Sequence, residues 1–138
     1  MNRDDLALLT FRLSRRLLAM EEPILAHHDI PMWAYAVLTA LRDGPTRTQT
    51  ALATAIGADK TRLIPILDDL QRRGLISRDS DPADRRVRLL ALTPDGRRTQ
   101  ESIRSQIRAG EEELLSALPA DERETFVRTL ITLVRTTA

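Results

Sequence analysis

The chain has 138 residues, of which 42% are hydrophobic and 30% are charged, a composition typical of one globular domain with its own core. The 21 basic and 20 acidic residues give a net charge of +1, which excludes a polybasic arm that coats nucleic acid by charge alone. The absence of cysteine excludes thiolate catalysis, Cys-ligated zinc and cysteine redox sensing. Aromatic residues make up 3%, too few for the stacking platforms that bind single strands.

The N-terminal segment MNRDDLALL lacks the basic-then-apolar order of a signal peptide, and no apolar run approaches the roughly 18 residues of a membrane span. We therefore expect a cytoplasmic protein with no membrane partner. The two histidines, His27 and His28, point about 100° apart on a helix and do not favour a metal site. Without a glycine-rich phosphate loop or a nucleophile motif, we expect neither an enzyme nor a bound cofactor.

Apolar residues near the N-terminus recur at helical spacing and predict a first helix of about five turns, with Asn2 as its N-cap. Arg16 borders this apolar stripe, where it can snorkel, pair with a carboxylate or bind an anionic ligand. A second helix is predicted from Met32 to Arg42, with Pro31 at its first position and Pro45 among the residues that end it. Trp33 in this helix either packs in the core or forms the aromatic rim of a small-molecule pocket.

The stretch from Thr48 to Leu92 has the order helix, tight turn, helix, strand, loop, strand, which is typical of a winged helix-turn-helix. Gly57 stands where a left-handed C-cap is required, and Asp59 can cap the next helix. That helix has one apolar face, made by Leu63, Leu67 and Leu70. At its outward-facing start lie side chains that are either merely solvated or suited to phosphates and base edges in a major groove: Lys60, Thr61 and Arg62.

The wing is predicted as two strands, Leu75–Arg78 and Val87–Leu92, joined by a loop rich in turn-forming residues. The loop ends in Asp84-Arg85-Arg86. An exposed arginine pair on a two-stranded ribbon can reach a DNA minor groove. An isolated loop of this sequence can equally be a solvated turn with an ion pair.

Beyond the wing, Thr93-Pro94 predicts the start of a long helix. Asp121 and Glu124 resemble a capping box at the start of a last helix. That last helix is apolar over too wide an arc for a lone helix in water. We therefore expect a symmetric dimer that buries it together with the N-terminal apolar stripe.

Three segments, LDDLQRRGLISR (67–78), DPADRR (81–86) and LTPDG (92–96), together with the order of elements, resemble the multiple-antibiotic-resistance-regulator (MarR) family. The resemblance spans nearly the whole chain. It implies a mainly α fold with a small β wing in one domain of residues 1–138. Within that domain, residues 1–30 and 94–138 would be dimerisation helices and residues 31–93 a winged helix-turn-helix DNA-binding lobe.

The resemblance also implies a homodimeric regulator, usually a repressor, that binds a pseudo-palindromic operator in double-stranded DNA. A small aromatic or anionic effector often releases such proteins by binding between the dimer and DNA-binding regions. Asp84 would orient Arg86 into the minor groove, while residues near Lys60 to Pro65 enter the major groove. The expected DNA-binding residues are Thr48, Gln49, Lys60, Thr61, Arg62, Pro65, Asp84, Arg85 and Arg86.

An effector pocket is expected between the first two helices and the base of the DNA-binding lobe, near Arg16, Met20, His28, Met32 and Trp33. Two features depart from the family pattern. The chain has no N-terminal cysteine, which argues against the peroxide-sensing members, and Pro65 within the recognition helix removes a backbone donor. The alternative function is a winged helix that contacts protein rather than DNA and has no ligand control.

Overall fold

The computed structural model describes residues 1–44 and 46–136, so Pro45 lies outside the described residues. The described residues form six α-helices and a two-stranded antiparallel sheet. The elements are α1 (Leu6–His27), α2 (Met32–Asp43), α3 (Gln49–Ile56), α4 (Lys60–Arg72), β1 (Ile76–Ser80), β2 (Arg88–Leu92), α5 (Pro94–Leu115) and α6 (Ala120–Arg135). The predicted mainly α fold with a small β wing is confirmed.

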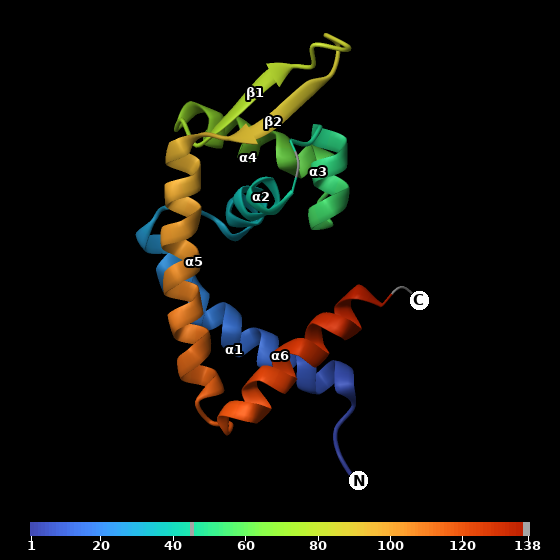
Figure 1. Cartoon of the computed structure of the whole chain (residues 1–138), viewed down its shortest axis with the longest axis vertical. Coiled ribbons are helices and arrows are strands. Elements are labelled where there is room, and N and C mark those ends of the chain that lie inside the picture. Colours follow the sequence, from blue (N-terminus) through green and yellow to red (C-terminus); the bar gives the residue numbers. More distant parts are fainter. Residues whose placement is uncertain (45, 137–138) are drawn as a thin grey trace.

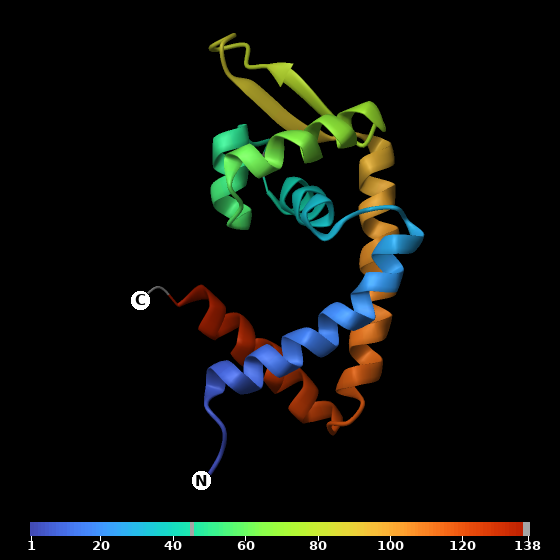
Figure 2. The same cartoon turned by 180° about the vertical axis from the view of Figure 1, so that it is seen from behind.

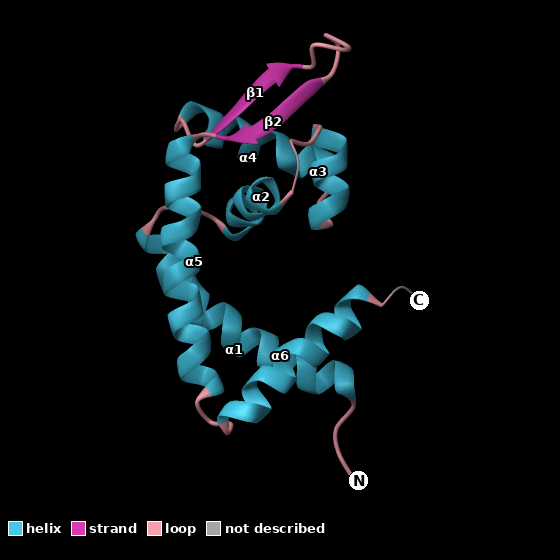
Figure 3. Ribbon diagram, in the orientation of Figure 1, coloured by secondary structure: helices cyan, strands magenta, loops and turns pink. Residues whose placement is uncertain are grey.

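The elements form two groups at opposite ends of α5 (Figure 1). Helices α2, α3 and α4 gather with the two strands at one end, and α1 and α6 cross each other towards the other end, as the view from behind also shows (Figure 2). The two strands project beyond the helices as a ribbon that ends in a loop (Figure 3). The N-terminus lies on the side of α1 and α6.

The core is concentrated in the lobe around α2, which packs against α3, α4, α5 and β2. Its central side chains are 2% exposed or less and include Ile30, Val37, Leu38, Leu52, Leu63, Leu67, Leu70 and Leu90. The predicted apolar face of α4 is thus the buried one. Burial of such side chains contributes about 1.5–3 kcal/mol each relative to leaving them in water.

The turn between α3 and α4 has the predicted geometry. Gly57 adopts φ 69°, the left-handed conformation that a side chain disfavours. The Thr48 hydroxyl caps α3 by accepting the Ala51 N–H at 3.1 Å, and the Asp59 carboxylate caps α4 by accepting the Thr61 N–H at 3.1 Å. Helix α4 remains α-helical through Pro65. Both helix starts are therefore rigidly placed.

The first wing strand extends further towards the loop than the sequence predicts, and the second begins at Arg88, one residue later than predicted. The register runs from Ile76 opposite Leu92 to Ser80 opposite Arg88, so β1 extends two residues past its expected end at Arg78. Asp79 and Ser80 are turn formers, but their pairing with β2 keeps them extended. A bridge between Arg47 and Leu90, which the sequence did not suggest, ties the segment before α3 to the wing.

Three helix starts also differ from expectation. Helix α1 begins after Asp5 instead of Asn2, and the neighbouring Asp4 pairs with Arg12 at 3.0 Å. Pro31 and Pro119 are N-cap residues of α2 and α6, because each already has the extended backbone that precedes a helix. Asp121 therefore lies in the first turn of α6, where a negative charge favours the helix dipole, and makes no capping bond.

Candidate DNA-binding surface

The start of α4 presents an exposed face. Lys60, Thr61, Arg62 and Pro65 are all exposed. Ile64 lies one turn after Lys60 and is 44% exposed although it is a large apolar residue. In a major groove, the donors of such a face can bind acceptors on base edges, and the apolar side chain can contact thymine methyl groups.

Two aspartates shape the tip of the wing. Asp81 Oδ1 accepts the Ala83 N–H at 2.9 Å, and Asp84 Oδ1 accepts the Arg86 N–H at 3.1 Å. The same Asp84 oxygen accepts the Arg86 Nε–H at 3.2 Å. The Arg86 side chain is 92% exposed. The structure thus holds Arg86 in a defined direction while leaving its guanidinium open to a partner.

A hollow of about 300 Å³ lies where α3, α4 and the wing meet, and its lining includes Thr48, Gln49, Thr50, Lys60, Arg86 and Arg88. Three of these side chains are cationic, and no acidic residue lines the hollow within the described part of the chain. The N-terminal ends of α3 and α4 add backbone N–H groups and positive helix dipoles. This combination suits a DNA phosphate.

The hollow brings together four of the nine expected DNA-binding residues: Thr48, Gln49, Lys60 and Arg86. The other five, Thr61, Arg62, Pro65, Asp84 and Arg85, lie on the same elements without lining it. Sequence reasoning missed Arg88 and Ile64. Both could have been found from the sequence, because Arg88 stands in the predicted second strand two residues after Arg86, and Ile64 follows Lys60 by four residues on a helix.

Polar contacts fix this surface to the rest of the protein. Arg78 of β1, whose side chain is 17% exposed, donates to Gln71 of α4 at 2.7 Å and pairs with Asp68 of the same helix. At the far end of α4, Arg73 donates to the carbonyl oxygens of Asp29 at 2.7 Å and His28 at 3.3 Å. The recognition helix is therefore anchored both to the wing and to the segment between α1 and α2.

The five expected effector-binding residues do not meet in one cavity. A cavity of about 590 Å³ between α1 and the start of α2 is lined by Met32 and by Arg15, the neighbour of Arg16. Arg16 and Met20 line a separate hollow of about 510 Å³ against the end of α5. His28 contacts Gln106 at 3.1 Å through its ring Nε2, and Trp33 is half-buried. Adjacent helical residues point about 100° apart, which explains the exchange of Arg16 for Arg15.

A pair of carboxylates lies between α1 and α5. Burial, and secondly the charge of Glu111, raise the pKa of Glu21 above its ordinary value. Glu111 is itself paired with Arg108 at 2.9 Å. The interface of these two helices therefore disfavours the charged form of Glu21 relative to a carboxyl group in water.

A recognition helix and a basic wing that flank one cationic hollow define a DNA-binding protein of the winged-helix class. Residues 28–87 match the MarR family. The chain is 34% identical over 111 residues to the transcriptional regulator HosA of Escherichia coli O157:H7, covering 78% of this chain and 80% of HosA. The chain belongs to the MarR family of transcriptional regulators, which are not enzymes.

A second relative is described as a transcriptional regulatory protein for the hcr operon of Thauera aromatica. It is 31% identical over 101 residues, which cover 73% of this chain and 61% of that protein. The chain therefore spans less than two thirds of that relative.

Two solved structures have the same fold over nearly the whole chain. The transcriptional repressor CouR bound to a 23-mer DNA duplex has a TM-score of 0.83 and 30% identity, with 95% of this chain and 93% of that chain covered. CouR from Rhodococcus jostii RHA1 bound to p-coumaroyl-CoA has a TM-score of 0.80 and 26% identity, with 98% and 95% covered. No helix among the described residues is long and apolar enough to cross a membrane.

Proposed function

We propose that this protein is a homodimeric transcriptional repressor that binds a pseudo-palindromic DNA operator and is released from it by a small effector. The observation that carries the DNA part is the cationic hollow between the two helix starts and the wing. A backbone phosphate in this hollow would place the start of α4 in the major groove. Lys60, Thr61 and Arg62 would then contact phosphates and base edges, and Ile64 a thymine methyl group.

The wing would act beside the recognition helix. Arg86, oriented by Asp84, would enter the adjacent minor groove, whose negative potential attracts a guanidinium. Arg85 would face phosphate or solvent, because it lies in the turn that the Val87 N–H closes on the Asp84 carbonyl oxygen at 2.9 Å and, unlike Arg86, does not line the hollow. The CouR structure with a DNA duplex supports this mode of binding by a similar fold.

The apolar faces of α1 and α6 support a homodimer. No residue of α6 is buried, and five of its large apolar side chains are 41–77% exposed: Val127, Leu130, Ile131, Leu133 and Val134. Helix α1 adds Leu6, Leu8, Leu9, Phe11 and Leu18, which are 41–63% exposed. Exposed apolar faces of this extent are typical of surfaces that are buried in an interface. A second copy provides the same two faces through two-fold symmetry, and two recognition helices then match two half-sites. In this proposal residues 1–30 and 94–138 form the dimerisation region and residues 31–93 the DNA-binding lobe.

The cavity between α1 and α2 supports control by a small effector. Its walls are mainly apolar, Glu22 and Asp29 are its acidic lining residues, and Arg15 supplies a cation that can pair with an anionic group. Asp29, whose carbonyl holds Arg73 of α4, is also part of its wall. An aromatic anion in this cavity, or in the neighbouring hollow at Arg16 and Met20, would therefore act close to an anchor of the recognition helix.

Selection of duplexes from a random pool by the purified protein tests the DNA part. The expected product is a pseudo-palindrome whose affinity falls steeply with salt, because each neutralised phosphate releases counterions. Recovery of no preferred duplex would reject DNA recognition and favour a protein-contacting winged helix. Hydroxylated aromatic acids and their coenzyme A thioesters can then be screened for release of the selected duplex from Arg15→Ala, Arg16→Ala and wild-type protein.

A further inference from the structure

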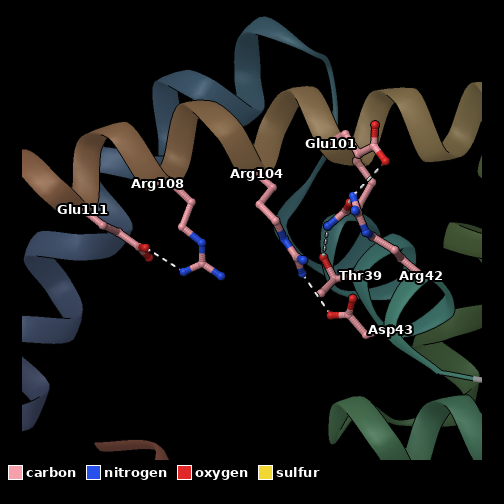
Figure 4. A network of polar contacts seen from close by, with 8 residues as sticks. Thr39, Arg42, Asp43, Glu101, Arg104, Arg108 and Glu111 are labelled. Carbon is pink, nitrogen blue, oxygen red and sulfur yellow. Dashed lines mark hydrogen bonds and ion pairs between the residues drawn. The ribbon is translucent and has the colours of Figure 1, made fainter. Parts of the chain in front are cut away.

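A polar network joins the last turn of α2 to the first half of α5 (Figure 4). Gln100 of α5 is fully buried. Its side-chain oxygen accepts a hydrogen bond from Arg42 at 2.7 Å, and its side-chain nitrogen donates to the Thr39 hydroxyl at 3.2 Å. A buried amide with both ends bonded has one orientation, because any other would leave a polar group unsatisfied.

Two ion pairs flank this amide. Arg42 of α2 pairs with Glu101 of α5 at 3.3 Å, and Arg104 of α5 pairs with Asp43 of α2 at 3.0 Å. Both arginine side chains are about three-quarters buried, with 26% and 27% exposed. Figure 4 shows that Arg104 extends across to α2, whereas Arg108, one turn further along α5, contacts Glu111 of its own helix.

The position of Asp43 in α2 also favours its ion pair with Arg104. It is the last residue of α2, where the carbonyl ends of the helix make a negative charge unfavourable. The guanidinium of Arg104 offsets this charge only while α2 and α5 keep their relative rotation. The packed core defines this rotation, and the directional hydrogen bonds of the network resist small departures from it.

The network lies between the two parts of the protein. Helix α2 packs against α3, α4 and β2, and α5 packs against α1. Apart from side-chain packing, the lobe is linked to α1 and α5 by the short segments 28–31 and Thr93. A rotation of α2 against α5 would therefore change the direction of α4.

We propose that Thr39, Arg42, Asp43, Gln100, Glu101 and Arg104 form a clamp that sets the half-site spacing which the dimer accepts. This inference rests on the proposed function as a dimeric DNA-binding protein. Helix α4 has 13 residues and is therefore about 20 Å long. A rotation of about 10° at the clamp moves the far end of such a lever by roughly 3.5 Å. This shift is close to the rise of one base pair, which also turns the half-site by about 35°. Arg104 and Asp43 are thus positioning residues for DNA recognition, although neither lies in the cationic hollow.

The test uses full-length protein and the duplex that the wild type selects from a random pool. Binding is measured to this duplex and to two others with one base pair inserted or removed between the half-sites. We expect the wild type to lose about tenfold or more on either change, since a misplaced half-site loses at least one base contact. For Arg104→Gln we expect the three affinities to lie within about threefold of one another. This difference is smaller than the loss of affinity that one lost base contact causes.

Arg98→Gln is the matched control. It removes the same charge from the same helix, but Arg98 is exposed and pairs with Asp95 in the first turn of α5. It should lower affinity slightly for all three duplexes and keep the spacing preference. The exchanged pair Asp43→Arg with Arg104→Asp should restore the preference. Thermal unfolding and sedimentation show whether each variant is folded and dimeric, and Asp43→Asn replaces Arg104→Gln if the latter does not fold.

The possible outcomes separate the two proposals. A wild-type spacing preference in a folded Arg104→Gln or Asp43→Asn variant overturns the clamp and leaves the proposed function standing. An equal loss of preference in Arg98→Gln also overturns it, because charge alone would then explain the effect. If the wild type selects no duplex, the proposed function fails and the role of the clamp fails with it.

Discussion

Asp84 Oδ1 lies 3.2 Å from the Nε of Arg86 and 3.1 Å from its backbone nitrogen. One carboxylate oxygen therefore accepts hydrogen bonds from both the side chain and the backbone of Arg86. The ion pair is exposed, and such pairs stabilise a fold by only about 0–1 kcal/mol. Its main effect is therefore on the orientation of the Arg86 side chain and not on the stability of the fold. The pair favours one direction of the guanidinium before DNA binds.

This relationship predicts unequal roles for the residues of the wing tip. Arg86→Ala should cost on the order of 1–3 kcal/mol of operator binding, about tenfold to hundredfold. Asp84→Ala should show part of the same loss, because the freed guanidinium must be ordered on binding. Arg85→Ala should mainly lower the salt slope by about one. Fluorescence anisotropy with the selected duplex at several salt concentrations measures all three.

The sign of the Asp84 effect is the informative result. Simple electrostatics predicts tighter binding when an acidic residue next to DNA is removed. Stronger binding by Asp84→Ala, or equal losses for Arg85→Ala and Arg86→Ala, would contradict the oriented-arginine mechanism.

Dimerisation should depend on the apolar face of α6. Leu130→Glu places a charge among Val127, Ile131 and Val134, and burying an unpaired charge is strongly unfavourable. We expect this variant to sediment as a monomer or to aggregate, and to bind the operator weakly. Thr132→Glu adds the same charge on the opposite, polar face of α6 and should remain a dimer. A dimeric Leu130→Glu protein would show that α6 does not form the interface.

Two helical glycines should respond differently to alanine. A Cβ at Gly96 would lie 1.9 Å from the backbone oxygen of Leu75, which cannot move without disrupting the start of the wing. A Cβ at Gly110 would lie 2.3 Å from the Met20 sulfur, at the flexible end of a side chain. We expect Gly96→Ala to destabilise the fold by about 1–3 kcal/mol or more.

For Gly110→Ala, the helix propensity gain of about 1 kcal/mol offsets the displacement of Met20 and leaves stability close to wild type. Urea denaturation of both variants measures the difference. Equal stabilities would mean that the contact between the start of α5 and Leu75 is looser than its geometry indicates.

The stability of the α1–α5 interface should depend on pH through Glu21. Burial and the charge of Glu111 raise the pKa of Glu21 in the folded state, so its ionisation destabilises the fold as pH rises above about 4.5, its ordinary value. Glu21→Gln should therefore increase the melting temperature at neutral pH. The gain should shrink as pH falls and vanish well below 4.5, where Glu21 is protonated in both states.

Glu22→Gln is the control for this effect, because it removes the same charge from the next, exposed position of α1. Differential scanning calorimetry at several pH values compares both variants with the wild type. A gain for Glu21→Gln that stays constant down to acid pH would rule out titration of this carboxyl as its origin.

The sequence by itself determined the features that depend on neighbours in the chain. Gly57, Asp59 and the pair Thr93-Pro94 mark helix ends because capping bonds connect residues two to four positions apart. The apolar face of Leu63, Leu67 and Leu70 follows from helical periodicity in the same way. The contact between Asp84 and Arg86 spans two residues, and so the wing pattern was also within reach of the sequence.

Only the tertiary structure decided which distant side chains meet. Arg42 and Gln100 are 58 residues apart, and Asp43 and Arg104 are 61 apart. Their meeting depends on the rotation of α2 against α5, which packing of the whole core sets and no local pattern encodes. The structure also places Arg15 instead of Arg16 at the larger cavity, and Arg88 with Lys60 in the lining of the hollow. Bonds between chain neighbours are fixed by backbone geometry, whereas contacts between elements are fixed by how all the buried side chains fit together.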